Sequence, residues 1–453
     1  MKISEVLQHP EELIPLLKFY GKSKKAPALA KQSDEKWRFC FNHLLKVSRS
    51  FAMVIMELEP EVRDAVCIFY LVLRALDTVE DDTTVPASRR KVDCVEFYKH
   101  VDEAGWSCTG YGKEHEKNLL EHYNIVVECF LSLNERYQVV IREICQKMGA
   151  GMAEHIEDTE CYTVDDYNRY CFYVAGLVGI GLSRLFYETG REDKCFVEDE
   201  HLSISMGQFL QKVNIIRDYA EDLDEERTFW PREIWSKYVP ELADLQKLSN
   251  EGKSLACLNH MVTNALGHVL DCIKYMKRIK NRQVFNFCAI PQIMGIGTLV
   301  EVYNNRNVFH TNVKLRRGTT AKLVVETSDF DKLMQLYYSC CVKIESKIPP
   351  NDPSYNETKV ILQEIMNVCM PHVPTVPNLA ILNRAVVVLF AAVVAYLINT
   401  RGERDGVFVI WKGGVPDTQE MVAIAAFFLV VTYLFSFFGL QFVKSERSAA
   451  ASF

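Results

Sequence analysis

Apolar residues recur at intervals of three and four along most of the chain, which is the period of an amphipathic helix. The clearest of these segments are 35–58, 61–82, 118–156 and 203–223. Alternating segments bounded by turn residues are scarce, and 321–328 (AKLVVETS) is the best strand candidate. The pattern therefore predicts an all-α protein, in which helices pack against one another around an apolar core.

Two apolar runs near the C-terminus are longer than an amphipathic pattern requires. Residues 421–440 contain no charge, and twenty such residues are enough to cross a bilayer. Residues 385–398 form a shorter run, which extends back to Leu379 if Arg384 reaches toward the membrane surface. The alternative for each run is a buried core helix. We predict a membrane anchor made of two helices, and basic residues on both flanks leave its orientation undecided.

Turn-rich and proline-rich stretches divide the chain further. The segment 370–378 (MPHVPTVPN) is typical of a short stiff linker. The predicted parts are an N-terminal segment (1–34), an all-α domain (35–369), the Pro-rich linker (370–378), the anchor (379–440, with helices at 379–399 and 420–440) and a polar tail (441–453).

Composition narrows the class of protein. Of 453 residues, 49% are hydrophobic and 25% charged, which is enough for a large buried core. The net charge of −7 provides no basic field, so we expect no nucleic-acid partner. The fifteen cysteines show no CxxC or Cys/His zinc spacing, and the N-terminus lacks the apolar run of a signal peptide. We therefore expect reduced thiols in a protein facing the cytosol.

Two acidic clusters follow apolar helical segments, and both have the spacing D-x-x-E-D. The six carboxylates are Asp77, Glu80, Asp81, Asp218, Glu221 and Asp222. At this spacing the three members of each cluster share one helix face. A solvated helix end is the alternative explanation, but like charges at this spacing destabilise a helix, and the macrodipole disfavours anions near its C-terminal end. Because the preceding residues are core-like, we expect these carboxylates to bind cations.

Carboxylate ligands without His or Cys indicate Mg²⁺ or Mn²⁺ rather than zinc. Mg²⁺ held by few carboxylates usually completes its shell with water and a phosphate-bearing substrate, so two facing clusters suit a diphosphate. The chain has no P-loop, which argues against nucleotide hydrolysis. Aromatic residues near the clusters are suited to stabilising a hydrocarbon cation, although each alone is also an ordinary core residue. They are Phe51, Phe69, Tyr70, Tyr167, Tyr170, Phe172 and Tyr173.

Five motifs within 35–320 resemble those of the squalene synthases in the squalene/phytoene synthase family. They are VSRSFA (47–52), YLVLRALDTVEDD (70–82), YCFYVAGLVGIGLSRLF (170–186), GQFLQKVNIIRDYAED (207–222) and FCAIPQIM (287–294). The resemblance implies an isoprenoid-synthase helical bundle. It also implies a two-step reaction, in which two farnesyl diphosphates form presqualene diphosphate and NADPH then reduces that intermediate to squalene.

The resemblance assigns roles to individual residues. Asp77, Asp81, Asp218 and Asp222 are expected in catalysis and metal binding, with Glu80 and Glu221 as further ligands. Tyr170 is expected to assist proton removal in the first step, which requires help from a nearby metal or cation because a free phenol is a weak base. Expected substrate contacts are Ser48, Arg49, Phe51, Tyr70, Arg74, Gln211 and Asn214. For the arginines the alternative is a surface ion pair, and for Gln211 and Asn214 a buried structural amide.

The glycine pattern GxxGxG in 176–181 is not a dinucleotide fingerprint, and no strand precedes it. We expect these glycines to allow close helix approach. The candidate NADPH segment is NVKLRRG (312–318), with Lys314, Arg316 and Arg317 on the phosphates, and contact with anionic lipid is the alternative. The resemblance places Phe287, Pro291 and Gln292 in the reductive part of the pocket.

Three functions remain open at this point. The leading prediction is a monomeric, NADPH-dependent enzyme of the squalene synthase type, in the endoplasmic-reticulum membrane with its catalytic domain in the cytosol. A phytoene or dehydrosqualene synthase needs no reduction, and a membrane-tethered prenyl-lipid carrier needs no catalysis. We assign Asp82, outside the shared spacing, to a supporting or surface role.

Overall fold

The computed structural model describes residues 9–23, 25–156 and 160–374. This part of the chain is helical, and its one isolated β-bridge joins Glu160 and Thr228. The predicted all-α class is therefore confirmed. By compactness the chain divides into two units, 18–373 and a second made of 1–17 with 374–453. The predicted membrane helices at 379–399 and 420–440 lie outside the described residues, as do residues 375–378 of the linker.

The helices follow one another along the chain as α-helices (α) and 3₁₀-helices (η), except that η3 is a π-helical turn. The first half contains η1 (Pro10–Glu12), α2 (Leu13–Ser23), α3 (Lys25–Gln32), α4 (Glu35–Val47), α5 (Arg49–Met56), α6 (Pro60–Asp81), α7 (Ala87–Glu96), η2 (Phe97–His100), α8 (Glu114–Glu121), α9 (Tyr123–Leu131), α10 (Glu135–His155), α11 (Val164–Cys171), η3 (Phe172–Gly176) and α12 (Leu177–Glu188). The second half contains α13 (Cys195–Glu198), α14 (Glu200–Arg217), α15 (Tyr219–Asp224), α16 (Arg232–Trp235), η4 (Leu242–Gln246), η5 (Leu248–Asn250), α17 (Glu251–Leu266), α18 (Val269–Arg278), α19 (Arg282–Val302), η6 (Arg306–Phe309), α20 (Arg317–Glu326), α21 (Phe330–Glu345), α22 (Tyr355–Cys369) and η7 (Met370–His372).

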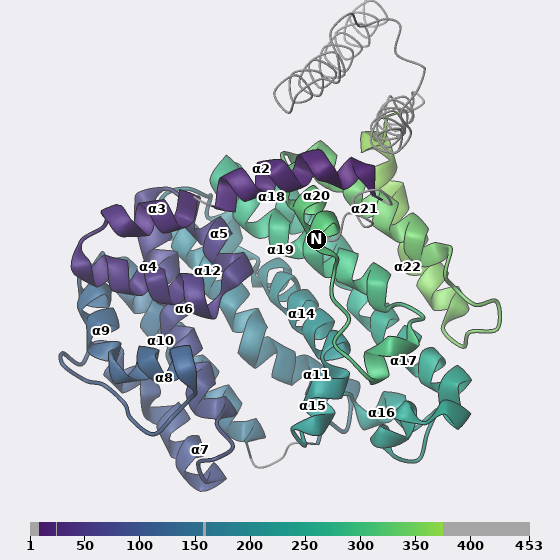
Figure 1. Ribbon diagram of the computed structural model, residues 1–453, viewed down its shortest axis with the longest axis horizontal. Helices are drawn as coiled ribbons and strands as arrows, with labels where there is room; N and C mark the ends of the chain where they lie inside the picture. Colours follow the sequence, from purple (N-terminus) through teal and green to yellow (C-terminus); the bar gives the residue numbers. More distant parts are fainter. Residues whose placement is uncertain (1–8, 24, 157–159, 375–453) are drawn as a thin grey trace, which may run out of the picture. The chain divides into compact units, whose positions relative to one another are not determined.

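Helix α14 runs through the middle of the bundle, packed against η3, α12, α17, α18 and α19 (Figure 1). Such a position requires apolar residues on several faces, and Leu202, Phe209, Val213 and Ile216 are all buried. Helix α6 begins at Pro60, whose fixed backbone suits a first helical turn, and packs against α4, α9, α10 and α12. The first acidic cluster lies in the last turns of α6, and the second lies just beyond α14, where Asp218 leads into the first turn of α15.

Glycines let the central helices approach closely. A methyl group on Gly179 would lie 2.1 Å from the carbonyl oxygen of Ser203, and one on Gly207 would lie 2.0 Å from that of Ala175. A methyl group on Gly181 would meet the ring of Phe69 at 2.5 Å. The prediction that this glycine-rich segment serves close helix packing is confirmed.

The strand candidate at 321–328 is wrong, because α20 covers Arg317–Glu326. Leu323 and Val324 are apolar residues that satisfy a strand pattern, but packing against α19 and α21 buries them in a helix. Two helical stretches of the described part, Val164–Glu188 and Arg282–Val302, are long and apolar enough to cross a membrane, and 50% and 78% of their apolar windows are buried in the bundle. All fifteen cysteines lie in the described part and are free, as expected for reduced thiols.

Candidate active site

The first acidic cluster occupies the last turns of α6. Asp77 and Glu80 are half-buried, whereas the side chain of Asp81 is 55% exposed. Burial raises the pKa of Asp77 to about 7, with Asp81 raising it further and Arg74 opposing. Burial and the two neighbouring aspartates also raise the pKa of Glu80. Carboxylates that are costly to ionise alone are stabilised by a bound cation, as expected of a metal site.

The second cluster lies where α14 ends and α15 begins. Asp218 is the residue between the two helices, and Glu221 and Asp222 stand in the first turn of α15. The side chain of Asp222 is 13% exposed, and its burial raises its pKa to about 7 against the opposing effect of Arg227. Arg217 binds both oxygens of Asp218, from Nε to Oδ1 at 2.8 Å and from Nη2 to Oδ2 at 2.6 Å.

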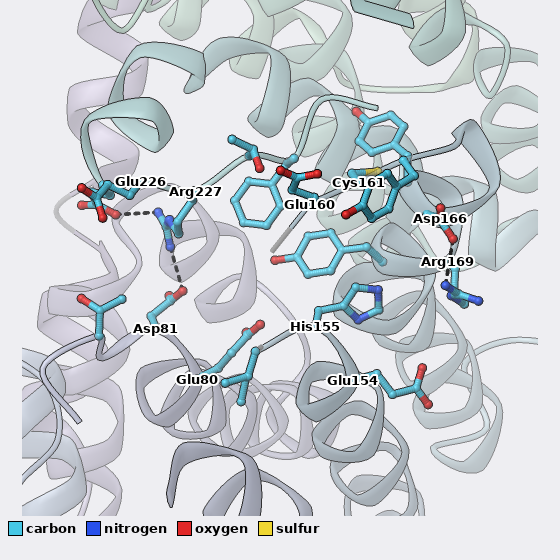
Figure 2. A pocket seen from close by; sticks show the side chains of 18 of the residues that line it. Glu80, Asp81, Glu154, His155, Glu160, Cys161, Asp166, Arg169, Glu226 and Arg227 are labelled. Carbon is cyan, nitrogen blue, oxygen red and sulfur yellow. Dashed lines mark hydrogen bonds and ion pairs between the residues drawn. The ribbon is translucent and has the colours of Figure 1, made fainter. Parts of the chain in front are cut away.

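Arg227 joins the two clusters (Figure 2). Its Nη1 donates to Asp81 Oδ1 at 2.9 Å, and its Nη2 donates to Asp222 Oδ1 at 3.1 Å. The same Nη2 lies 2.8 Å from Glu225 Oε2. The clusters therefore face each other across one guanidinium, although 137 residues separate Asp81 from Asp218 (218 − 81) in the sequence. No pattern in the sequence singles out Arg227, because one arginine after an acidic run is typical of an ordinary local ion pair.

The donor set of this site fits a divalent cation that also binds phosphate. All six predicted ligands offer carboxylate oxygens, which Mg²⁺ prefers. Among the described residues, however, no three His, Cys, Asp or Glu side chains already surround a single point. One or two carboxylates per ion is the usual arrangement for Mg²⁺ held jointly by protein and substrate phosphate. The clusters are thus suited to two sides of a diphosphate and not to a closed all-protein cage.

A cavity of about 600 Å³ opens beside the clusters, with Glu80, Asp81 and Arg227 on one side and Asp166 and Arg169 on the other (Figure 2). Tyr170 lines this cavity, stacked on Phe229 with ring centroids 4.9 Å apart. Burial, and then Glu80 and Asp81, raise the pKa of Tyr170 well above its ordinary value. The phenol is therefore neutral beside these carboxylates, and it needs a cation nearby before it can ionise and accept a proton.

His155 is a second residue of the site that no sequence pattern predicts. It ends α10, lines the same cavity, and meets the ring of Tyr170 edge to face with centroids 5.2 Å apart. Its Nδ1 lies 3.0 Å from the carbonyl oxygen of Gly151, which fixes the plane of the ring. No local pattern singled it out, since the histidine only meets Tyr170 through the packing of α10 against α11 and η3.

A second, apolar cavity of about 140 Å³ has Asp77 in its lining. Four predicted substrate or cofactor residues, Phe51, Tyr70, Arg74 and Phe287, line it. Only Arg74 and Asp77 are charged among its lining residues, so the cavity is apolar with an ionic end. Arg74 donates from Nη2 to the Tyr70 hydroxyl at 3.2 Å, while its buried Nε has no partner within the described structure. This geometry suits a hydrocarbon chain whose charged head lies at Asp77 and Arg74.

The other predicted substrate and cofactor residues differ in how deeply they are buried. Ser48 is buried at the joint between α4 and α5, and the side chain of Arg49 lies outside the described part. Gln211 is half-buried and Asn214 exposed, so Asn214 is no buried structural amide. Gln292 is 1% exposed and donates to the Met206 carbonyl at 2.8 Å, which ties α19 to α14. Pro291, inside α19, is half-buried.

The predicted NADPH segment lies against the second acidic cluster. Lys314, Arg316 and Arg317 are exposed and lead into the N-terminus of α20. Asn312, at the start of the segment, donates to both Asp218 and Glu221. Asp82 belongs to another loop, where its carboxylate accepts from the backbone of Thr84 at 3.1 Å and of Gly112 at 2.7 Å, consistent with a supporting role.

Comparisons with known proteins agree with this geometry. The sequence profile of the squalene/phytoene synthase family matches residues 44–319. Squalene synthase 2 of Panax ginseng is 47% identical over 370 residues, covering 81% of this chain and 88% of the relative. Squalene synthase 1 of Arabidopsis thaliana is 47% identical over 371 residues, covering 81% and 89%. The solved structure of TcSQS with the ligand BPH1237 superposes with a TM-score of 0.73 at 42% identity, covering 75% of this chain and all of that one. The chain is a member of the squalene/phytoene synthase family.

Proposed function

We propose that the protein is a squalene synthase, a farnesyl-diphosphate farnesyltransferase with an NADPH-dependent second step. In the first step two farnesyl diphosphates join, and presqualene diphosphate, one diphosphate and one proton are released. In the second step presqualene diphosphate loses its diphosphate, rearranges, and takes a hydride from NADPH to give squalene and NADP⁺. The curated relatives of this chain are squalene synthases, which favours this function over a non-reductive phytoene or dehydrosqualene synthase.

The observation that carries the proposal is the opposition of the two acidic clusters across Arg227, beside an apolar cavity that ends at Asp77. Diphosphate leaves as an anion, so its departure needs positive charge at the oxygens that gain electrons. Asp77, Glu80, Asp81, Asp218, Glu221 and Asp222 would hold Mg²⁺, which would supply Lewis-acid stabilisation of that leaving group. Arg74, Arg217 and Arg227, which lie among these carboxylates, are the proposed contacts for the diphosphate oxygens.

The apolar cavity has a separate task. Phe51, Tyr70 and Phe287 hold the hydrocarbon chain and exclude water, which would otherwise capture a carbocation. Their aromatic faces stabilise positive charge on carbon. Tyr170, close to Arg227, is the proposed aid in removing the proton of the first step, with His155 bounding the same cavity. Lys314, Arg316 and Arg317 are the proposed contacts for the NADPH phosphates.

The cellular setting is part of the same proposal. The apolar runs at 379–399 and 420–440 anchor a monomeric enzyme in the endoplasmic-reticulum membrane, with the catalytic domain on the cytosolic side. That side supplies the reducing environment in which fifteen free cysteines persist. An apolar product of thirty carbons is also released most readily into a bilayer.

The test is a product assay on the full chain in detergent. Farnesyl diphosphate and Mg²⁺ are supplied with and without NADPH, and the expected result is squalene only when NADPH is present. A thirty-carbon product unaffected by NADPH would indicate a non-reductive synthase, and tight binding without turnover would indicate a carrier. Asp77→Ala and Asp218→Ala should each lower diphosphate release at least about a hundredfold with an unchanged circular dichroism spectrum. A variant that keeps a near-normal rate would contradict the assignment of that residue.

A further inference from the structure

Helix α2 exposes an apolar stripe where the outer face of a surface helix normally carries polar residues. Residues three and four apart share a helix face, and on α2 that face is apolar. Its members are Leu13, Ile14, Leu17 and Tyr20, whose exposed fractions are 40%, 49%, 66% and 62%. Single exposed apolar residues are ordinary on a protein surface, but four on one face of one helix form a patch that marks an interaction site.

The opposite side of α2 makes the contact with the bundle. Phe19 is half-buried and packs against the hydrophobic core. Two residues correspond to about 200° of rotation around a helix, so Phe19 and Leu17 point to opposite sides. The exposed stripe is therefore additional to the face by which α2 joins the core.

The residues in and after the stripe carry charge of one sign. The segment 13–33 contains no aspartate or glutamate, although the whole chain has a net charge of −7. It does contain five lysines, namely Lys18, Lys22, Lys24, Lys25 and Lys31. Of these, Lys18 directly follows Leu17 and is exposed. An apolar stripe accompanied by lysines alone is typical of a helix that lies in the headgroup region of an anionic bilayer.

A protein surface fits this face less well than a bilayer does. A second copy of the chain, seated α2 against α2, would bring two sets of five lysines together, and like charges across an interface are unfavourable. Another protein would have to offer an apolar groove with an acidic border. An anionic bilayer supplies both features at once, because its acyl chains lie directly beneath its phosphate groups.

We propose that the exposed stripe of α2 lies on the membrane surface, with its apolar side chains among the upper acyl segments and its lysines at the anionic headgroups. The inference goes beyond the proposed function, since it requires neither turnover nor a metal site. A helix of this kind lies in the plane of the interface and does not span it. Its contact would fix which side of the catalytic domain faces the bilayer, which a C-terminal anchor alone does not determine.

A photoreactive side chain in the stripe tests the contact directly. Benzoylphenylalanine replaces Leu17 or, as the matched control, Leu248, because both leucines are 66% exposed. The full chain is reconstituted in vesicles of phosphatidylcholine and phosphatidylserine and then illuminated. Crosslinking to phospholipid from position 17 should exceed that from position 248 at least about tenfold. It should fall about threefold or more when phosphatidylserine is left out.

Leu17→Glu is the second test, and Leu248→Glu is its control. Both replace an exposed leucine by a residue of similar helix propensity, so the Tm should not change in either. In the mixed vesicles, amide hydrogen exchange within 13–23 should be about tenfold faster in Leu17→Glu than in wild type or Leu248→Glu. The difference should shrink in vesicles of phosphatidylcholine alone, which separates loss of the lipid contact from an effect on the helix itself.

Three results would overturn the proposal. They are equal lipid crosslinking from the two positions, crosslinking from position 17 to protein alone, and exchange within 13–23 that Leu17→Glu leaves unchanged. The second of these would assign the stripe to the C-terminal apolar runs or to another chain. Extraction with alkaline carbonate tests the C-terminal anchor separately, and squalene formation enters neither readout. Failure of the α2 contact is therefore distinguishable from failure of the proposed function.

Discussion

Lys212 provides the sharpest test of the energetics of this fold. It lies on the central helix α14 and is 2% exposed, which is rare for a lysine. Its Nζ donates to Asn264 Oδ1 at 2.7 Å and lies 5.2 Å from the ring centroid of Tyr167. These contacts are with a neutral amide and an aromatic ring, and burial lowers the pKa of Lys212 from 10.5 to about 8. We predict that Lys212→Met stabilises the protein at neutral pH and destabilises it at high pH.

The size of the effect follows from the difference between the two pKa values. The pKa of Lys212 falls from 10.5 to about 8, and each pKa unit corresponds to about 1.36 kcal/mol. Burying the charged amine therefore costs about 3 kcal/mol. Between those pKa values the unfolded chain binds more protons than the folded protein, so stability rises with pH across that range. Loss of the hydrogen bond leaves the Asn264 amide oxygen without its donor, which costs about 2 kcal/mol at every pH because the neutral amine also donates. Lys212→Met should therefore be about 1 kcal/mol more stable than wild type at pH 7 and about 2 kcal/mol less stable near pH 10.5.

The assay is urea unfolding of the full chain in detergent, with wild type and variant measured side by side from pH 7 to pH 10.5. Other groups titrate in this range, but they do so in both proteins and cancel in the difference. Lys274→Met is the control, because the Lys274 side chain is 63% exposed and its removal should give a difference that varies little with pH. A Lys212→Met difference that stays constant across the range would refute the reasoning that burial controls this amine.

Three further predictions follow from close packing, the bridging guanidinium and the cofactor segment. Gly179→Ala, which sets a methyl carbon 2.1 Å from the Ser203 carbonyl oxygen, should cost at least about 2 kcal/mol and lower the Tm. Gly252→Ala, with no atom within 4 Å, should leave the Tm unchanged or higher, and an equal loss in both would contradict the packing argument. Arg227→Gln should destabilise the protein in EDTA by about 2 kcal/mol, because its loss leaves the facing carboxylates without a shared donor. In thermal unfolding, Mg²⁺ should stabilise this variant more than wild type. An equal response to Mg²⁺ would contradict the bridging role of Arg227. Lys314→Ala should let presqualene diphosphate accumulate in the product assay, whereas an unchanged dependence on NADPH would place the cofactor elsewhere.

Local signals in the sequence were sufficient for much of the fold. The three- and four-residue spacing of apolar positions predicted helices where α4, α6, α10 and α14 lie, because it directly records which face of a helix is buried. The same signal failed at 321–328, where a short apolar run fits a strand or a helix equally and only packing in α20 decided. The GxxGxG pattern correctly predicted close helix packing, because the absence of a preceding strand excluded a dinucleotide-binding fold.

The candidate site shows the same difference between local sequence signals and long-range packing. The sequence by itself determined the D-x-x-E-D spacing and hence that Asp77, Glu80 and Asp81 share one face, since neighbours at three and four residues are set by helix geometry alone. Only the tertiary structure decided that this face meets the second cluster through Arg227, that His155 reaches the ring of Tyr170, and that Asn312 ties the basic segment to Asp218. Such contacts join residues far apart in the chain, and their geometry depends on how whole helices pack, which no local spacing records.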